Sequence, residues 1–119
     1  MKKLLLSVAI LGAFSINAFA CEGWKSEYFK LASKTTAYGL TYAKYAEGKY
    51  SEDKFNGKKE RLLKDIEELK SYVNSTESCS GKESRKTKLQ SWISKVIDAI
   101  KSNSNEASAL AKQIKDDFH

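Results

Sequence analysis

Apolar side chains recur at helical spacing from residue 24 onward. In the first stretch, apolar or partly apolar residues follow one another in steps of four and three: Trp24, Tyr28, Leu31, Thr35, Tyr38, Tyr42 and Tyr45. Such steps keep side chains on one face of an α-helix, because a turn takes about 3.6 residues. Gly48 follows the stripe, as a glycine often follows a helix. The pattern predicts a helix over residues 23–46.

A second stripe with the same spacing begins shortly after this glycine. Its members are Phe55, Lys59, Leu62, Ile66, Leu69 and Val73. The aliphatic stem of Lys59 takes the place of an apolar side chain in it. Ser51, followed by Glu52 and Asp53, is typical of a helix start, since serine caps free backbone N–H groups and acids complement the helix dipole. We therefore predict a helix over 52–74, paired with the first as a helical hairpin.

Two further stripes occupy the last third of the chain. The first consists of Leu89, Ile93, Val96 and Ile100, widened by Trp92 and Ile97, and predicts a helix over 83–102. The second consists of Ala107, Leu110, Ala111, Ile114 and Phe118, and predicts a helix over 105–118. The polar residues 102–105 between them do not break the period, so a turn and a continuous helix both remain open. Serine and asparagine prefer caps to helix interiors, which favours the turn.

These elements together predict the fold class. The stripes are all helical, and the chain contains no proline and few other residues typical of sheet turns. We expect an all-α fold, a small antiparallel bundle of three to four helices.

The first twenty residues follow a different pattern. Lys2 and Lys3 precede an apolar run over 4–14, and the small-residue motif Ala18-Phe19-Ala20 follows it. This is the order of a secretory signal peptide. The apolar run has eleven residues, too few for a helix that spans a bilayer, which needs about 20. We expect residues 1–20 to be removed and residues 21–119 to fold as a single domain in the periplasm or outside the cell.

The two cysteines are expected to form a disulfide, Cys21 to Cys79. An even number of cysteines in a small exported domain is typical of disulfide pairing. The bond would close a loop of roughly 58 residues, which the chain-entropy model values at about 4 kcal/mol. An antiparallel bundle also brings the start of the first helix close to the link between the second and third.

A lipid-modified Cys21 is the alternative, because this residue would come first after cleavage. Lipidation would attach the protein to a membrane and leave Cys79 without a partner. The bulky Phe19 counts against it, since lipoprotein signals carry a small residue at that position. Membrane attachment is expected only under this alternative.

The distribution of charge argues against a nucleic-acid partner and does not indicate another. The formal net charge of +6 falls to about +4 once Lys2 and Lys3 are removed. Basic residues gather over 58–64 and 82–88, but acidic residues are interleaved with them, as on solvated helix faces with pairs three or four residues apart. We expect no nucleic-acid partner.

The residues that catalysis requires are poorly supplied. His119 is the only histidine and the last residue, where chains fray, and both cysteines are expected to be oxidised. Metal-ligand spacing and a glycine-rich phosphate loop are both missing from the sequence. The sequence therefore predicts no enzyme activity, no cofactor and no metal site.

The first helix carries the candidate binding residues. Rigid, amphipathic aromatic side chains are common at interfaces, so we take as candidate partner-binding residues Trp24, Tyr28, Tyr38, Tyr42 and Tyr45. The alternative is that they pack in the core with their hydroxyls at the surface. A second apolar line on the same helix consists of Phe29, Ala32, Thr36, Leu40 and Ala43. The two lines cannot both face one neighbour, so some apolar surface should be exposed, or covered by a partner or a second copy.

These features favour a binding role over a chemical one. We expect an exported helical interaction protein that binds a protein partner, as an inhibitor, immunity or exclusion factor would. An envelope stress chaperone or a binder of anionic surfaces is the alternative, and a small-ligand carrier a further one. A homodimer would also account for the surplus apolar surface.

Overall fold

The protein is a bundle of helices, described here from a computed structural model. The structure describes residues 21–118, so the expected signal peptide at 1–20 and His119 lie outside the described part. Within it the helices are α2 (Lys25–Ala46), α3 (Glu52–Ser75), α4 (Glu83–Lys101) and α5 (Ala107–Asp117). Their bounds lie within two residues of the ranges that the hydrophobic pattern predicts. The predicted all-α class is confirmed.

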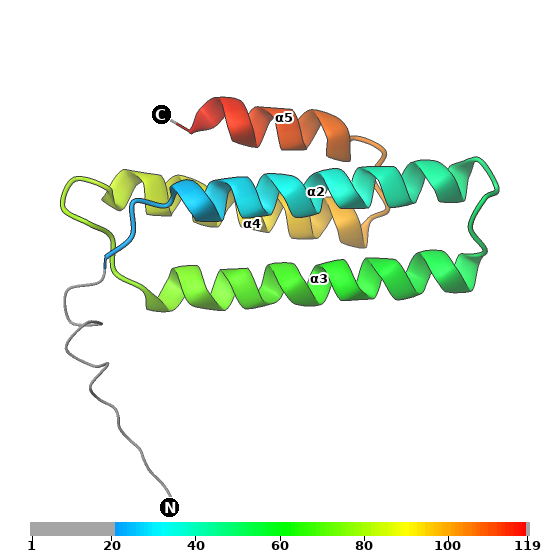
Figure 1. Cartoon of the computed structure of the whole chain (residues 1–119), viewed down its shortest axis with the longest axis horizontal. Helices are drawn as coiled ribbons and strands as arrows, with labels where there is room; N and C mark the ends of the chain where they lie inside the picture. Colours follow the sequence, from blue (N-terminus) through cyan, green and yellow to red (C-terminus); the bar gives the residue numbers. More distant parts are fainter. Residues whose placement is uncertain (1–20, 119) are drawn as a thin grey trace, which may run out of the picture.

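Helix α2 is the central element of the bundle. It lies between α3 and α5, with α4 behind it in the view of Figure 1. It packs against all three of these helices, whereas α5 packs only against α2 and α4. Consecutive helices run antiparallel, as short connections require. One side of α2, the side facing the viewer in Figure 1, therefore has no helix of residues 21–118 over it.

The hairpin between α2 and α3 is built from the expected turn chemistry. Gly48 has a φ of 79°, the left-handed conformation that ends many helices and that glycine adopts without steric cost. The Glu47 N–H closes the helix by donating to the Ala43 carbonyl at 2.9 Å. Ser51 then caps α3, because its hydroxyl accepts from the Lys54 N–H at 3.1 Å. The start of α3 that the sequence predicts is confirmed.

Residues 102–105 form a turn. This is the alternative that the preference of serine and asparagine for helix caps favoured, so that prediction is confirmed. Asn103 has a left-handed φ of 56°, which breaks the helix even though the hydrophobic period continues through it. The Asn103 Oδ1 also accepts from the Lys59 ammonium at 2.7 Å, which ties the turn to α3. The same Lys59 ammonium lies 5.9 Å from the centroid of the Phe55 ring.

The core consists of the four predicted stripes. Its largest fully buried side chains come from all four helices and from the residue before α2: Trp24, Tyr28, Leu31, Tyr38, Phe55, Ile66, Val73, Leu89, Ile93, Val96, Ile100 and Ile114. Burial of these apolar side chains is the main favourable contribution to folding.

A disulfide holds one end of the bundle together. Cys21 and Cys79 are bonded, with their Cα atoms 4.8 Å apart. Beside it the backbone of Glu22 pairs with residues 77–79: the Glu22 N–H donates to the Glu77 carbonyl at 3.1 Å, and the Cys79 N–H donates to the Glu22 carbonyl at 2.9 Å. The predicted disulfide is confirmed, and it occupies the sulfur atom that lipidation of Cys21 would need.

A search of the described helices for membrane spans found none that combines the necessary length and apolar character.

Candidate interaction surface

Three of the five candidate partner-binding residues lie in the core. Trp24 and Tyr38 are fully buried, and Tyr28 is 1% exposed. Tyr42 and Tyr45 are partly buried and pack around Phe55, with the Tyr45 ring stacked at 4.3 Å between centroids. A partner could touch Trp24, Tyr28 or Tyr38 only if the bundle opened. Partner binding by these five residues remains a prediction, and their placement directs attention to the other face of α2.

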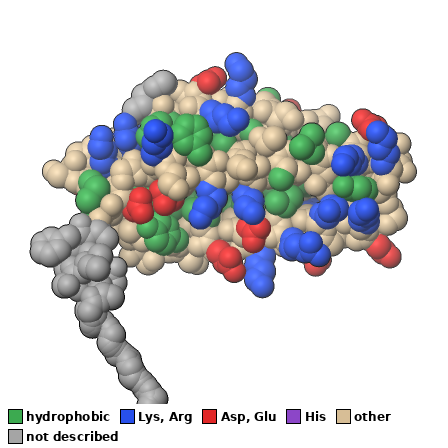
Figure 2. Space-filling model, in the orientation of Figure 1, with side chains coloured by type: hydrophobic (Ala, Val, Ile, Leu, Met, Phe, Trp, Pro, Cys, Tyr) green, Lys and Arg blue, Asp and Glu red, His purple; other side chains and the backbone are tan. Residues whose placement is uncertain are grey.

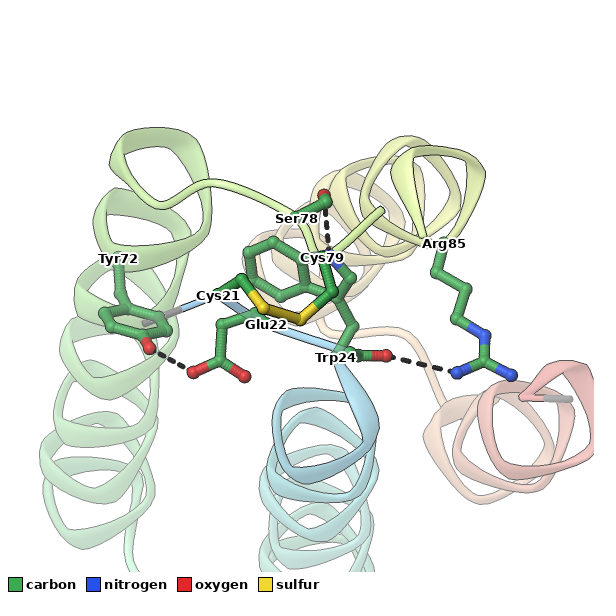
Figure 3. Close-up of a disulfide and its surroundings, with 8 residues drawn as sticks. Cys21, Glu22, Trp24, Tyr72, Ser78, Cys79 and Arg85 are labelled. Carbon is green, nitrogen blue, oxygen red and sulfur yellow. Dashed lines mark hydrogen bonds between the residues drawn. A yellow bond between two sulfur atoms is a disulfide. The ribbon is translucent and has the colours of Figure 1, made fainter. Parts of the chain in front are cut away.

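Trp24 joins the start of α2 to the link between α3 and α4. Its backbone has a φ of 73°, an uncommon conformation for a residue other than glycine. The indole N–H donates to the Ser78 hydroxyl at 2.8 Å, and the Lys86 ammonium lies 5.9 Å from the ring centroid. Figure 3 shows the ring beside the disulfide. Trp24 therefore stabilises the disulfide end of the bundle from the inside.

Tyr28 anchors the end of α5. Its hydroxyl donates to the Asp117 Oδ2 at 3.4 Å, and the Trp92 indole N–H donates to the same oxygen at 2.8 Å. Burial, followed by the negative charge of Asp117, raises the pKa of Tyr28 to about 12. The hydroxyl is therefore a hydrogen-bond donor throughout the physiological range, in a structural role.

Tyr38 differs from Tyr28 because its hydroxyl lacks a hydrogen-bond partner among residues 21–118. Burial, with a smaller effect of Tyr42, raises its pKa to about 12, so the hydroxyl stays protonated. A buried polar atom without a partner costs free energy. Tyr38 is thus a core aromatic residue whose ring is packed but whose hydroxyl makes no hydrogen bond within residues 21–118.

The exposed face of α2 carries apolar side chains of its own. Leu40 is 62% exposed and Phe29 is 41% exposed, and both belong to the second apolar line of the sequence. Between them lie the small side chains Ser33, Thr36 and Ala37. These five residues, which we call the α2 outer surface, line a shallow groove of about 360 Å³ together with Lys115 of α5. Hydrophobic side chains are visible along this face in Figure 2.

Cations border the α2 outer surface on several sides. Lys115 lines the groove from α5, and Lys58 and Arg61 line a neighbouring groove on the α3 side. Lys30 and Lys44 lie on the same face of α2 by helical spacing and are both exposed. From residue 35 to residue 43 the helix itself carries no charge. An apolar strip with a basic border is the result.

A second basic feature lies at the hairpin between α2 and α3. The ammonium groups of Lys44, Lys54 and Lys58 approach one aromatic ring, that of Tyr50, at 5.5, 4.5 and 5.5 Å from its centroid. No ion pair involves these three lysines in the described part of the chain. Three like charges around one ring form a local site of positive potential.

The candidate residues chosen from the sequence lie on the buried side of α2, whereas its exposed large apolar side chains, Phe29 and Leu40, lie on the other side. The regular spacing of the aromatic residues from Trp24 to Tyr45 indicates one helix face. That spacing is the same whether the face packs in the core or lines a binding groove. The second line, with Phe29 and Leu40, was recognised as surplus apolar surface without being chosen as the site. Lys58 belongs to the basic stretch 58–64 of the sequence, but the gathering of three lysines around Tyr50 was not expected, because the turn at Gly48 brings two helices together there.

No group of three or more acidic, cysteine or histidine side chains within residues 21–118 has a geometry that could hold a metal ion. Comparison of the chain with models of protein families, with curated proteins and with solved structures found no match.

Proposed function

We propose that this protein is an exported, non-enzymatic interaction module that binds a protein partner through the α2 outer surface. The observation that carries the proposal is the exposure of Leu40 and Phe29, at 62% and 41%, on a helix whose other sides are covered by α3, α4 and α5. Large apolar side chains that cluster on an exposed face mark interaction sites more often than scattered ones do. A periplasmic or secreted location accords with the disulfide.

The border of the surface defines the chemistry of the partner. Lys30, Lys44, Lys58, Arg61 and Lys115 surround the apolar strip. A second copy of this chain would bring like charges together, which opposes self-association. The partner that fits is a protein segment with an apolar strip between acidic side chains, such as one face of an amphipathic helix. Blocking such a segment is how an inhibitor, immunity or exclusion factor would act.

Site-specific cross-linking in cells tests the proposal. A photo-cross-linking residue replaces Ser33 on the α2 outer surface or, as control, Ser91, which is exposed on α4. We expect one heterologous protein to be captured from position 33 and not from 91, and the capture to be lost in F29S/L40S with its helical circular dichroism unchanged. The purified partner should then bind the wild type at least about tenfold more tightly than the variant, as loss of two apolar contacts implies.

Three outcomes would overturn the proposal. Capture from both positions would indicate non-specific binding, as expected of a chaperone. Capture of a second copy, together with a dimer in analytical ultracentrifugation, would make the surface a homodimer interface. Binding that survives F29S/L40S would place the partner elsewhere on the molecule.

A second candidate function, binding to anionic surfaces, is favoured by the lysines around Tyr50. The probe is a vesicle of phosphatidylglycerol, compared with one of phosphatidylcholine. K54A/K58A should weaken binding to the anionic vesicles by roughly tenfold or more, because each cation near such a surface contributes about 1 kcal/mol. The control K70A/K95A removes the same charge from exposed positions away from the turn between α2 and α3. Equal losses in both variants would leave only a general effect of net charge.

A further inference from the structure

The groove between α2 and α3 differs from the rest of the surface in its charge. It has a volume of about 510 Å³ and is lined from α2 by Glu27, Lys30 and Lys34, and from α3 by Asp65, Glu68, Leu69 and Tyr72. Lys34 and Asp65 neutralise each other in an ion pair of 2.8 Å. The remaining lining contains two acids and one cation, and the acid Glu22 lies beside it. On a chain of positive net charge this groove is locally acidic.

Glu27 is the unusual residue of this groove. It is 7% exposed, and its Oε1 atom has no hydrogen-bond partner among the described residues. Burial is the main cause that raises its pKa above the ordinary value of 4.5. Its backbone N–H and the charge of Lys30 lower the pKa, while the charge of Glu22 and a hydrogen bond with it raise the pKa further. Buried polar atoms are normally hydrogen-bonded, so the Oε1 atom of this carboxyl is an unsatisfied acceptor.

Glu22 and Tyr72 complete the end of the groove next to the disulfide. The Tyr72 hydroxyl donates to the Glu22 Oε2, and Figure 3 shows the tyrosine reaching from α3 toward this carboxylate. Tyr72 is nevertheless 42% exposed, about as much as Phe29. The hydrogen bond is the main cause that raises its pKa to about 12. An exposed aromatic ring thus lies beside two carboxyl groups.

We propose that this groove binds a basic side chain, the ammonium of a lysine or the guanidinium of an arginine, presented by a protein or peptide. Glu68 and Glu27 supply negative charge, the Tyr72 ring offers a face for a cation, and Leu69 can pack against the aliphatic stem. A bound cation favours the ionised form of Glu27 and so opposes the rise in its pKa that burial causes. The groove borders the α2 outer surface at Lys30 but shares none of the five residues of that surface, so its binding does not depend on them.

Nuclear magnetic resonance titration tests the site with three probes: N-acetyl-arginine amide, N-acetyl-lysine amide and the uncharged N-acetyl-norleucine amide. We expect the two cationic probes to shift the amide signals of residues 27, 30, 68, 69 and 72, and the uncharged probe to leave them in place. E68Q should weaken binding by about tenfold, the usual worth of a hydrogen bond to a charged group. The matched control is E67Q, which removes the same charge from the same helix at an exposed position outside the groove.

The dependence on pH is a second readout. Binding of the cationic probes should weaken as pH falls from 7 toward 4.5, because Glu27 takes up a proton, and E27Q should weaken binding at pH 7 and flatten this dependence. If E27Q does not fold, E68Q against E67Q still decides the matter. Equal losses in E67Q and E68Q, binding of the norleucine probe, or no localised shifts would overturn the proposal. F29S/L40S should bind the probes normally, so this test fails independently of the proposed partner surface.

Discussion

Both sides of α2 carry large apolar side chains, but their surroundings differ. On the inner side Trp24, Leu31 and Tyr38 are each fully buried by neighbouring helices. On the outer side Phe29 and Leu40 keep large exposed fractions, because α3 and α5 flank the helix without closing over it. The comparison teaches that apolar spacing identifies helix faces, but the number of neighbouring helices decides which face is core.

The largest expected effect on stability comes from removing the disulfide next to the start of α2. C21S/C79S should lower the free energy of unfolding by about 4 kcal/mol, since the bond closes a loop of 58 residues in the unfolded chain. Urea denaturation followed by circular dichroism measures the loss, and reduction of the wild type should reproduce it. A loss below about 1 kcal/mol would mean that the backbone pairing of Glu22 and the packing of Trp24 hold this end without the cross-link.

Two leucines on the same helix offer the most direct comparison. L31A removes a fully buried side chain and should cost about 2–5 kcal/mol, because it leaves a cavity in the core. L40A removes a side chain that is 62% exposed and should change stability by less than about 0.5 kcal/mol. Both free energies come from the same denaturation experiment. Similar costs for the two variants would show that something covers the outer side in solution.

A smaller effect is expected at the hydroxyl of Tyr38. Because this buried group has no hydrogen-bond partner within residues 21–118, Y38F should be neutral or stabilise the fold by up to about 1 kcal/mol. Y28F is the matched control, since its hydroxyl bonds Asp117, and it should destabilise by about 1 kcal/mol. Thermal unfolding of the two variants side by side measures the difference. A loss in Y38F as large as that in Y28F would reveal a partner for the Tyr38 hydroxyl.

Glu27 is the acidic residue on the inner side, and we expect the smallest effect there, because Lys30 and its own backbone N–H offset part of the burial. A carboxyl whose pKa is raised on folding favours the protonated form, so its contribution to stability falls as pH rises above the ordinary value of 4.5. E27Q removes the charge and should flatten this decline. Unfolding free energies measured between pH 4 and 7 test the sign, and a steeper decline in E27Q would contradict it.

The fold could be predicted from local patterns because they agree with one another. Ser51 caps α3 at the position where the apolar spacing also predicts a helix start. Gly48 ends the preceding helix with a positive φ. The disulfide followed from combining the bundle topology with the positions of Cys21 and Cys79. The accessible site did not follow, because the aromatic line of α2 has the same spacing whether it faces the core or a partner.

The sequence by itself determined the helices and their turns, since each depends on the periodicity or chemistry of nearby residues, and its two cysteines in an exported chain indicated the cross-link. Tertiary structure alone decided which side of α2 is exposed, where three lysines surround Tyr50, and that Glu27 is buried beside Glu22 and Tyr72. These outcomes depend on how the helices and the turns between them are placed in space. The pattern along the chain indicates which residues share a helix face, but not which other helices pack against that face. Those packing partners determine whether a side chain is buried, which charges lie near it and whether a partner can reach it.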